Sequence, residues 1–178
     1  MGYIIMTQEL MDLRKSILEG RYADALLIVD ELEGMSRQAI LRQIQSFLRI
    51  LLIHLIKNQV EQRLTNSWAN SIRNSIREIK KLNLQDNKTS YYVKIDDWES
   101  ILDDEFEEAV SQASEEVMGG AYSPFQLLEL VDKDQIIAMA KTLLSLTYDY
   151  SAKELSQVVN DRLTQLPGGE DWKLNRQK

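Results

Sequence analysis

Residues 36–56, SRQAILRQIQSFLRILLIHLI, decide the fold of this 178-residue chain. Their apolar side chains recur three or four positions apart, which is the spacing of one face of an α-helix. Ile50, Ile53 and Ile56 extend the apolar surface around the second half of this helix. A helix that is apolar on nearly all sides normally has neighbours on more than one face. We therefore predict that this helix, opened by Ser36, lies at the centre of the protein.

The segments on either side of the central helix also have helical patterns. Upstream, one helix runs from a cap at Thr7 to a stop at Gly20, and a second short helix covers residues 22–33 and ends at Gly34. Downstream, five further apolar stripes each follow a polar residue that can cap a helix: Ser67, Asp96, Ser123, Asp132 and Ser151. The sequence thus predicts an all-α fold, a single irregular bundle of six to eight helices around a central apolar helix.

The composition is that of one globular domain. The chain is 44% hydrophobic and 28% charged, and it has two prolines and seven glycines, so few turns are forced. Regular structure is expected to end at Pro167-Gly168-Gly169. We predict a single helical domain over residues 1–166 and a flexible C-terminal tail over 167–178, unless Trp172 docks on the domain.

The same sequence favours a cytoplasmic protein without a membrane anchor. Its most apolar run, residues 47–56, has about half the length that a bilayer requires and contains Arg49. The first ten residues lack the pattern of a secretory signal, and the absence of cysteine excludes disulfides.

Charge is distributed unevenly along the chain, whose net charge is −7. Residues 36–94 contain eleven bases and three acids, whereas residues 95–132 contain twelve acids and no base. Three interpretations stay open. A basic face could bind nucleic acid weakly, an acidic face could dock a basic protein, or the two segments could partly neutralise one another. The candidate partner-binding residues are Arg73, Arg77, Lys80 and Lys81 on the basic side and Asp103, Asp104, Glu107 and Glu108 on the acidic side.

A single histidine, His54, is the main candidate for catalysis. A histidine near neutrality can act as a general base, but it needs a nucleophile or an orienting acid within reach. Because the sequence marks neither, we predict instead a structural, hydrogen-bonded histidine in the central helix and assign no catalytic residue. One histidine cannot supply the two Glu-x-x-His pairs of a di-metal bundle site, and no phosphate-binding loop is present. We predict no cofactor and no metal site.

Several stretches resemble the bacterial domain-of-unknown-function family numbered 29. The resemblance lies in residues 18–22 (LEGRY), 30–36 (DELEGMS), 52–59 (LIHLIKNQ) and 67–73 (SWANSIR), and it covers roughly residues 10 to 130. It implies an all-helical fold and no established activity, cofactor or partner. The polar loop at residues 84–94 and the chain beyond Val131 depart from the family's usual pattern.

Taken together, these patterns leave the function open. The leading hypothesis is a non-enzymatic helical domain that binds a protein partner. The alternatives are an enzyme that uses His54 with carboxylates from other helices, and a weak nucleic-acid-binding module. A pocket lined by His54 and at least two acids would favour the enzyme, whereas an exposed apolar groove would favour binding.

Overall fold

The computed structural model describes residues 2–85 and 89–176, and these residues form eight α-helices and no strand. This confirms the predicted all-α fold with a long central apolar helix. The helices are α1 (Gly2–Leu18), α2 (Tyr22–Glu61), α3 (Asn66–Asn83), α4 (Trp98–Ser114), α5 (Pro124–Leu130), α6 (Lys133–Asp149), α7 (Ala152–Leu163) and α8 (Gly169–Lys173). Short 3₁₀ turns cover Ile95–Asp97 and Val117–Gly119, and Leu84 and Tyr91 form an isolated antiparallel bridge across the loop between α3 and α4.

The central helix is longer than the sequence indicated. We expected a short helix that ends at Gly34 and a new one from Ser36, but α2 runs without a break from Tyr22 to Glu61. Gly34 keeps a negative φ, whereas Gly20 adopts a φ of +73° and closes the turn before α2. A glycine inside a helix costs only about 1 kcal/mol, so strong helix formers on both sides carry the helix across it.

Three of the seven predicted caps are confirmed, because capping depends on local chemistry. The side chains of Ser123, Asp132 and Ser151 accept hydrogen bonds from the backbone N–H three residues later. Ser36 lies inside α2, and Asp96 lies inside the 3₁₀ turn that precedes α4, whose N-cap is Asp97. The start of α3 differs: Thr65, and not Ser67, accepts from the N–H of Trp68 at 3.1 Å. The start of α1 also differs, since this helix already begins at Gly2.

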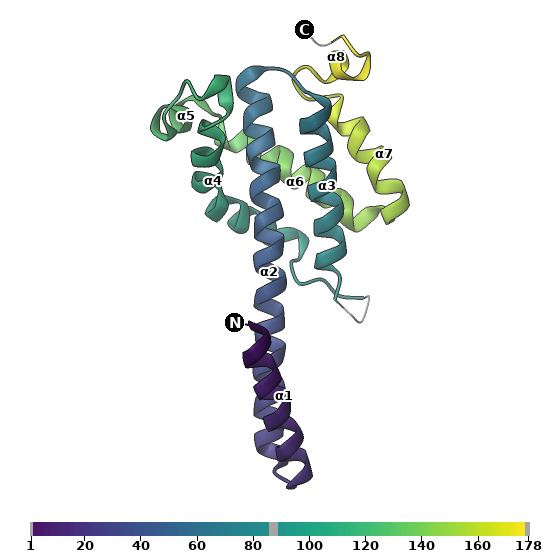
Figure 1. The fold of residues 1–178 in the computed structure, drawn as a ribbon. Coiled ribbons are helices and arrows are strands. Elements are labelled where there is room, and N and C mark those ends of the chain that lie inside the picture. The colour runs from purple at the N-terminus through teal and green to yellow at the C-terminus, as the bar shows by residue number, and fades with distance from the viewer. Residues whose placement is uncertain (1, 86–88, 177–178) are drawn as a thin grey trace. The chain divides into compact units, whose positions relative to one another are not determined.

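The chain divides into two compact units, Met1–Arg42 and Gln43–Lys178. In the second unit, the latter part of α2 lies between α3 and α4, and α6 contacts both of those helices (Figure 1). α5 covers α4, and α7 packs on α3 and α6. The core draws its largest fully buried side chains from α2, α3 and α4 and from the segment before α3: Ile44, Leu48, Leu51, Leu52, Ile56, Leu64, Ile72, Ile76, Ile79, Trp98, Leu102 and Phe106.

α2 is long enough and apolar enough, by length and composition, to cross a membrane. A third of its most apolar 18-residue window is buried inside the protein. Leu48, Leu51 and Leu52 are fully buried there, and Arg49 in the same stretch pairs with Glu105. These contacts account for the buried third of the window, and its other residues are half-buried or exposed.

The segment that follows Pro167 contains α8, and the indole side chain of Trp172 in this helix contacts the rest of the second unit. Nε1 of Trp172 donates a hydrogen bond to Oδ1 of Asn66 at 2.7 Å. Gly169 is buried, and a Cβ atom at this position would lie 2.4 Å from the carbonyl oxygen of Leu163. We expected residues 167–178 to be a flexible tail unless Trp172 docks on the domain, and its hydrogen bond to Asn66 is a contact of that kind.

Candidate functional site

Two of the four basic residues predicted on α3 are used within the fold. A guanidinium nitrogen of Arg73 donates to Oδ1 of Asn160 on α7 at 2.8 Å, and Nζ of Lys80 donates to the carbonyl oxygen of Thr147 on α6 at 2.6 Å. Both side chains are half-buried. A cation that already donates a hydrogen bond to a neighbouring helix is less available to a phosphate, because that hydrogen bond must be broken first.

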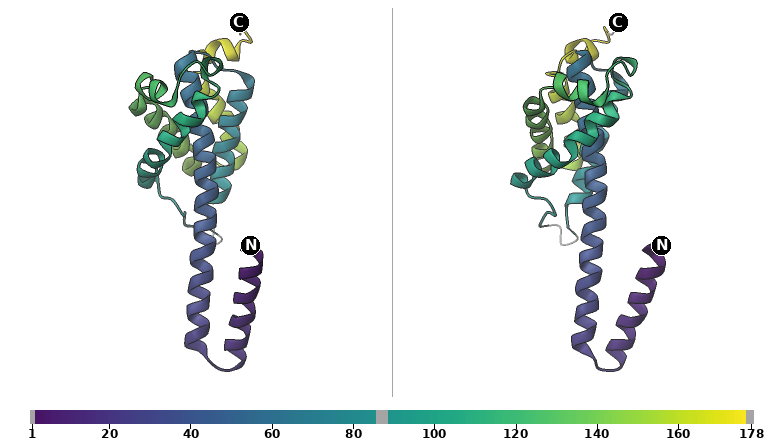
Figure 2. Two further views of the ribbon diagram at one scale, coloured as in Figure 1. Left: turned by 60° about the vertical axis from the view of Figure 1, so that its left-hand side comes forward. Right: turned by 90° about the vertical axis from the view of Figure 1, so that its left-hand side faces the viewer.

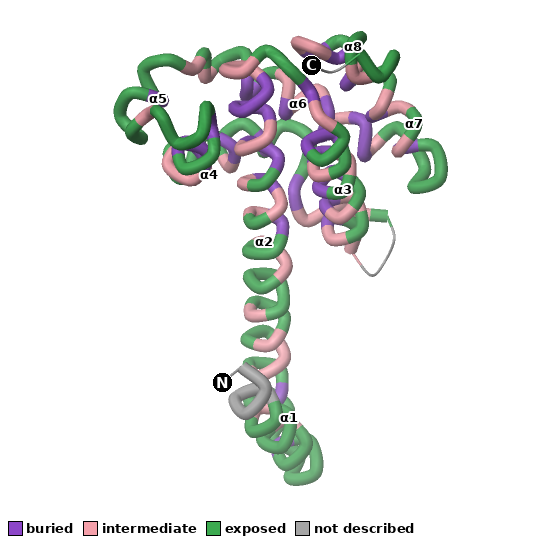
Figure 3. The backbone as a smooth tube through the Cα atoms, turned by 45° about the horizontal axis from the view of Figure 1, so that its top comes forward, coloured by how far each residue is buried: buried purple, intermediate pink, exposed green. Residues whose placement is uncertain are grey.

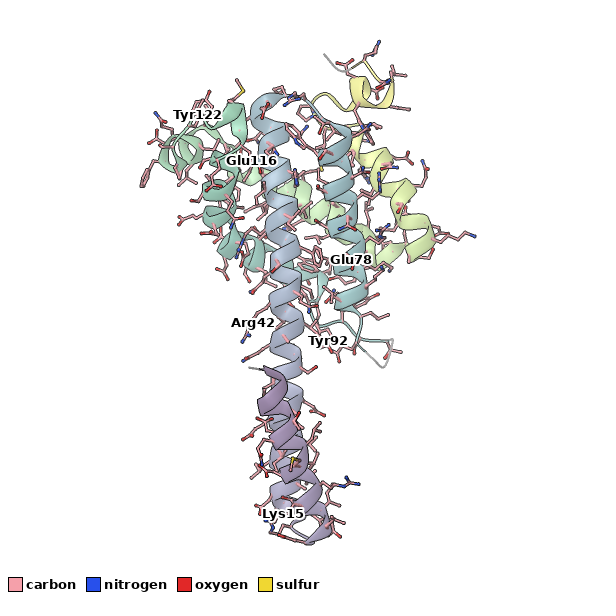
Figure 4. All side chains as sticks on the ribbon, viewed as in Figure 1. Lys15, Arg42, Glu78, Tyr92, Glu116 and Tyr122 are labelled. Carbon is pink, nitrogen blue, oxygen red and sulfur yellow. The ribbon has the colours of Figure 1, made fainter. Side chains whose placement is uncertain are left out.

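The other two bases of α3 lie at the surface. Arg77 donates to Oδ1 of Asn74 at 3.1 Å, and Nζ of Lys81 lies 3.2 Å from Oε1 of Glu78, which is labelled in Figure 4. Such exposed pairs within one helix are worth a few tenths of a kcal/mol, so both cations stay accessible. Two accessible charges make a small basic surface.

The predicted acidic face of α4 is exposed. It consists of Asp103, Asp104, Glu107 and Glu108. Asp103 forms an ion pair with Lys133 of α6, and Glu108 accepts a hydrogen bond from Gln112. Within residues 2–85 and 89–176, Asp104 and Glu107 have no ion-pair partner. This face therefore presents negative charge to solvent.

The bases that pair with the acidic segment come from α2 and α6. Two nitrogens of Arg49 donate to Oε2 of Glu105 at 3.0 and 2.9 Å, and Nζ of Lys57 lies 2.5 Å from Oε2 of Glu116. Lys141 of α6 pairs in the same way with Glu99. The basic and acidic segments thus neutralise one another in part, through the α2 bases.

His54 lies one helical turn before Lys57 in α2 and interacts electrostatically with Glu116, which is labelled in Figure 4. Its Nδ1 atom is buried and has no hydrogen-bond partner among the described residues. Burial lowers the pKa of His54 to about 4, with a further lowering from Lys57 and a smaller opposing effect of Glu116. The imidazole is therefore neutral at physiological pH.

The surroundings of His54 do not provide a catalytic arrangement. The carboxylate that acts on it, Glu116, is already bound by Lys57, and this hydrogen bond lowers the pKa of Glu116. Four surface cavities of about 350 to 680 Å³ occur among the described residues, and His54 lines none of them. In the described part of the chain, no three acidic or histidine side chains converge as metal ligands would. The histidine has an electrostatic neighbour but no orienting acid.

Sequence reasoning missed the cluster around Lys57. This lysine is buried, and its Nζ lies 4.8 Å from the centre of the Trp68 ring, while Arg63 stacks on the same ring at 4.7 Å. Cations over an indole ring are attracted by its negative face. The only signal in the sequence was a lysine on the apolar side of α2, one turn after His54. The cluster connects α2, α3 and the end of α4.

An open, mostly apolar groove lies between α2, α6 and the segment before α8. Its volume is about 350 Å³. Leu55 contributes from α2, Ile136 and Met139 from α6, and Leu166 and Pro167 from the connecting segment. The groove has polar amides at its rim and no ionisable lining residue. It has room for an apolar side chain and lacks a group that could perform acid–base chemistry.

The first unit contains a helical hairpin formed by α1 and the first part of α2 (Figure 2). The N–H of Arg21 bonds the carbonyl oxygen of Ser16 at 2.8 Å and so closes the turn at Gly20. Among residues 7–42, only Ser16 and Ala25 are buried, and the rest of this stretch is half-buried or exposed (Figure 3). The hairpin therefore leaves much of its apolar surface uncovered.

Six apolar side chains of the two helices lie on one side of the hairpin, whereas the exposed Met11, Leu18 and Leu27 lie on the other side. Ser16 and Ala25 mark the sides by which the helices face one another. Successive residues of a helix are turned by about 100° around its axis. On this scale three apolar side chains of α1 lie roughly 60 to 120° from Ser16, and three of α2 lie roughly 40 to 100° from Ala25. Both sets are turned in the same direction when each helix is viewed from its own N-terminus. Because the helices are antiparallel, this rotation turns both sets to the same side. We call this surface the hairpin face: Leu10, Leu13, Ile17, Tyr22, Leu26 and Val29.

The sequence was compared with known families, proteins and structures. Residues 8–134 match the family model described as "Domain of unknown function DUF29". This confirms the resemblance drawn from the sequence motifs. No curated protein and no solved structure matches the chain.

Proposed function

Since the chain belongs to the DUF29 family, whose description states no activity, we propose its function from the geometry alone. We propose that it is a non-enzymatic protein-interaction domain of the cytoplasm, and that the hairpin face is its contact surface. The observation that carries this proposal is the exposure of Leu10, Ile17, Tyr22 and Leu26, each at least half exposed and all on one side of the hairpin.

The free energy gained by removing apolar surface from water supports this assignment. Covering apolar surface contributes about 25 cal/mol per Å². Among residues 7–42 the hairpin buries only Ser16 and Ala25, so it obtains little of this stabilisation by itself. Contiguous exposed apolar surface rimmed by polar residues is typical of binding sites on soluble proteins. A partner that covers the hairpin face would supply the missing contacts.

The acidic face of α4 is a second candidate surface. Asp104 and Glu107 have no counter-charge in the described residues, so a basic partner could approach them without breaking an existing ion pair. Charge of this kind mainly raises the association rate and the selectivity for a basic partner. We assign it a supporting role beside the hairpin face.

The two alternatives have less support. For an enzyme, His54 needs a free carboxylate, and Lys57 already holds Glu116. For nucleic-acid binding, Arg73 and Lys80 are engaged by neighbouring helices, and the net charge of −7 opposes a polyanion.

The test uses a photo-reactive benzophenone amino acid at position 26 or 27 in the native cell. Leu26 and Leu27 are 64% and 63% exposed, but Leu27 lies on the other side of α2 from the hairpin face. We expect a discrete protein adduct from position 26 and none from position 27. Equal adducts from both positions, or none from either, would show that the hairpin face is not a specific contact surface.

A further inference from the structure

The hairpin face is carried by two antiparallel helices, the arrangement found in half of a four-helix bundle. Leu10 and Ile17 from α1 and Tyr22 and Leu26 from α2 are each at least half exposed. In a helical bundle the apolar side of two helices is covered by a second pair of helices. A surface of two helices is best matched by another surface of two helices.

The charges of the hairpin favour an identical partner. Residues 1–42 contain five bases and seven acids, a net charge of only −2, so two copies repel one another weakly. Residues 14–21 at the turn contain three bases and one acid, whereas residues 30–33 contain three acids and no base. Within each hairpin Glu19 pairs with Lys15 and Arg21, and Asp24 pairs with Arg21, all at the exposed surface. When two hairpins pair antiparallel, these exposed bases of one copy lie beside the acidic stretch of the other.

The apolar area also agrees with that of a dimer. The four residues are each half to two-thirds exposed, so together they offer roughly 300 Å² of apolar surface. A standard interface buries about 800 Å² per partner, of which about 56 to 65% is apolar. With Leu13 and Val29 added, the hairpin face supplies the larger part of that apolar area.

We infer that the occupant of the hairpin face is a second copy of this chain, and that two hairpins pair antiparallel about a twofold axis near Leu26. This inference rests on the proposed role of the hairpin face as a contact surface. In a twofold dimer both copies use the same surface, so each hairpin face is covered by the hairpin face of the other copy.

The first experiment measures the mass of the purified full chain by sedimentation equilibrium. We expect twice the 20.6 kDa of one chain. Leu10→Glu with Leu26→Glu should give a monomer, while the matched pair Met11→Glu with Leu27→Glu, on the other side of the hairpin, should leave the dimer intact. Far-ultraviolet circular dichroism controls for folding. A monomeric wild-type chain, or a dimer that both pairs leave unchanged, overturns the inference.

A second experiment fixes the orientation. The chain has no cysteine, so a single introduced thiol reports only on contact between copies. Under mild oxidation Leu26→Cys should form a disulfide-linked dimer, whereas Leu27→Cys and Arg21→Cys should not. Efficient linkage through Arg21→Cys would place the two turns together and overturn the antiparallel arrangement.

The proposed function and this inference can fail separately. If the wild-type chain is monomeric but the benzophenone at position 26 captures a different protein, the contact surface stands and the second copy is excluded. If the monomer instead floats with vesicles of anionic lipid and captures no protein, both proposals fail in favour of a membrane surface.

Discussion

At the scale of single residues, the structure separates positions that look alike in sequence. Gly34 and Gly169 both lie within helices and each has a glutamate beside it in the sequence, but of the two only Gly169 is packed against other backbone. His54 and Lys57 both lie near the apolar side of α2, but Lys57 is paired with Glu116 while Nδ1 of His54 has no partner in the described residues. These contacts, and not residue type, determine what a substitution will do.

We expect Gly169→Ala to destabilise the protein by about 1 to 3 kcal/mol, because its Cβ would lie 2.4 Å from the carbonyl oxygens of Leu163 and Thr164. Gly34→Ala is the control. No atom lies within 4 Å of a Cβ at position 34, and alanine in a helix should stabilise by up to about 1 kcal/mol. Urea unfolding measures both changes. Equal midpoints for the two variants would contradict the close packing of Gly169.

The second prediction concerns the titration of His54. Its folded pKa of about 4 lies below the unfolded value of 6.5, so the unfolded state binds a proton first as the pH falls. Stability should therefore be lost between about pH 6.5 and pH 4, by about 1 to 3 kcal/mol after allowance for solvent screening. The loss should be absent in His54→Gln.

Proton NMR measures this pKa directly, because the chain has one histidine and hence one imidazole titration. We expect a midpoint near pH 4. A midpoint near 6.5 would mean that the imidazole is solvated and that our description of its environment is wrong.

At the scale of elements, α2 shows how one helix can have two environments. Its second half supplies Leu48, Leu51 and Leu52 to the core, whereas Tyr22 and Leu26 at its start are exposed. The apolar pattern is similar in both halves, and only the helices that pack around the second half distinguish them. The pairing of charged side chains also depends on neighbouring helices, since bases of α2 and α6 pair with acids of α4.

We expect Leu51→Ala to cost about 2 to 5 kcal/mol, because the side chain is fully buried and its removal leaves a cavity. The neighbouring Ile50 is 38% exposed, so Ile50→Ala should cost less than about 1.5 kcal/mol. Denaturant midpoints test both. An unchanged midpoint for Leu51→Ala would remove this residue from the core.

For α3, we expect no nucleic-acid binding tighter than roughly 10⁻⁵ M near 0.15 M salt, because few phosphates can be neutralised. Titration of labelled duplex and single-stranded nucleic acid is the measurement. Sub-micromolar binding that Arg73→Glu with Arg77→Glu abolishes would instead favour a nucleic-acid-binding module.

At the scale of the whole molecule, the two units differ in how much they bury. Among the residues whose burial the structure describes, all the large fully buried side chains lie in residues 43–178, and residues 7–42 contain two buried residues. Protection from local unfolding follows buried contacts, so the two units should open at different free energies.

Hydrogen exchange followed by mass spectrometry tests this difference within one continuous helix. At low protein concentration, where self-association is weak, amides of residues 22–42 should exchange faster than those of residues 44–60, although both belong to α2. Raising the concentration should slow exchange in the hairpin alone. Uniform protection along α2 would contradict the division into two units.

The sequence by itself determined the helical class, the caps at Ser123, Asp132 and Ser151, and the apolar core of α2, because helical period and capping depend on residues close together in the chain. It did not show that α2 is continuous through Gly34, since the competing energies there differ by only about 1 kcal/mol. Only the tertiary structure decided which charges pair, how Lys57 contacts Trp68, and which apolar side chains are left uncovered on the hairpin face. These features depend on which helices lie side by side, and packing between distant segments sets that arrangement.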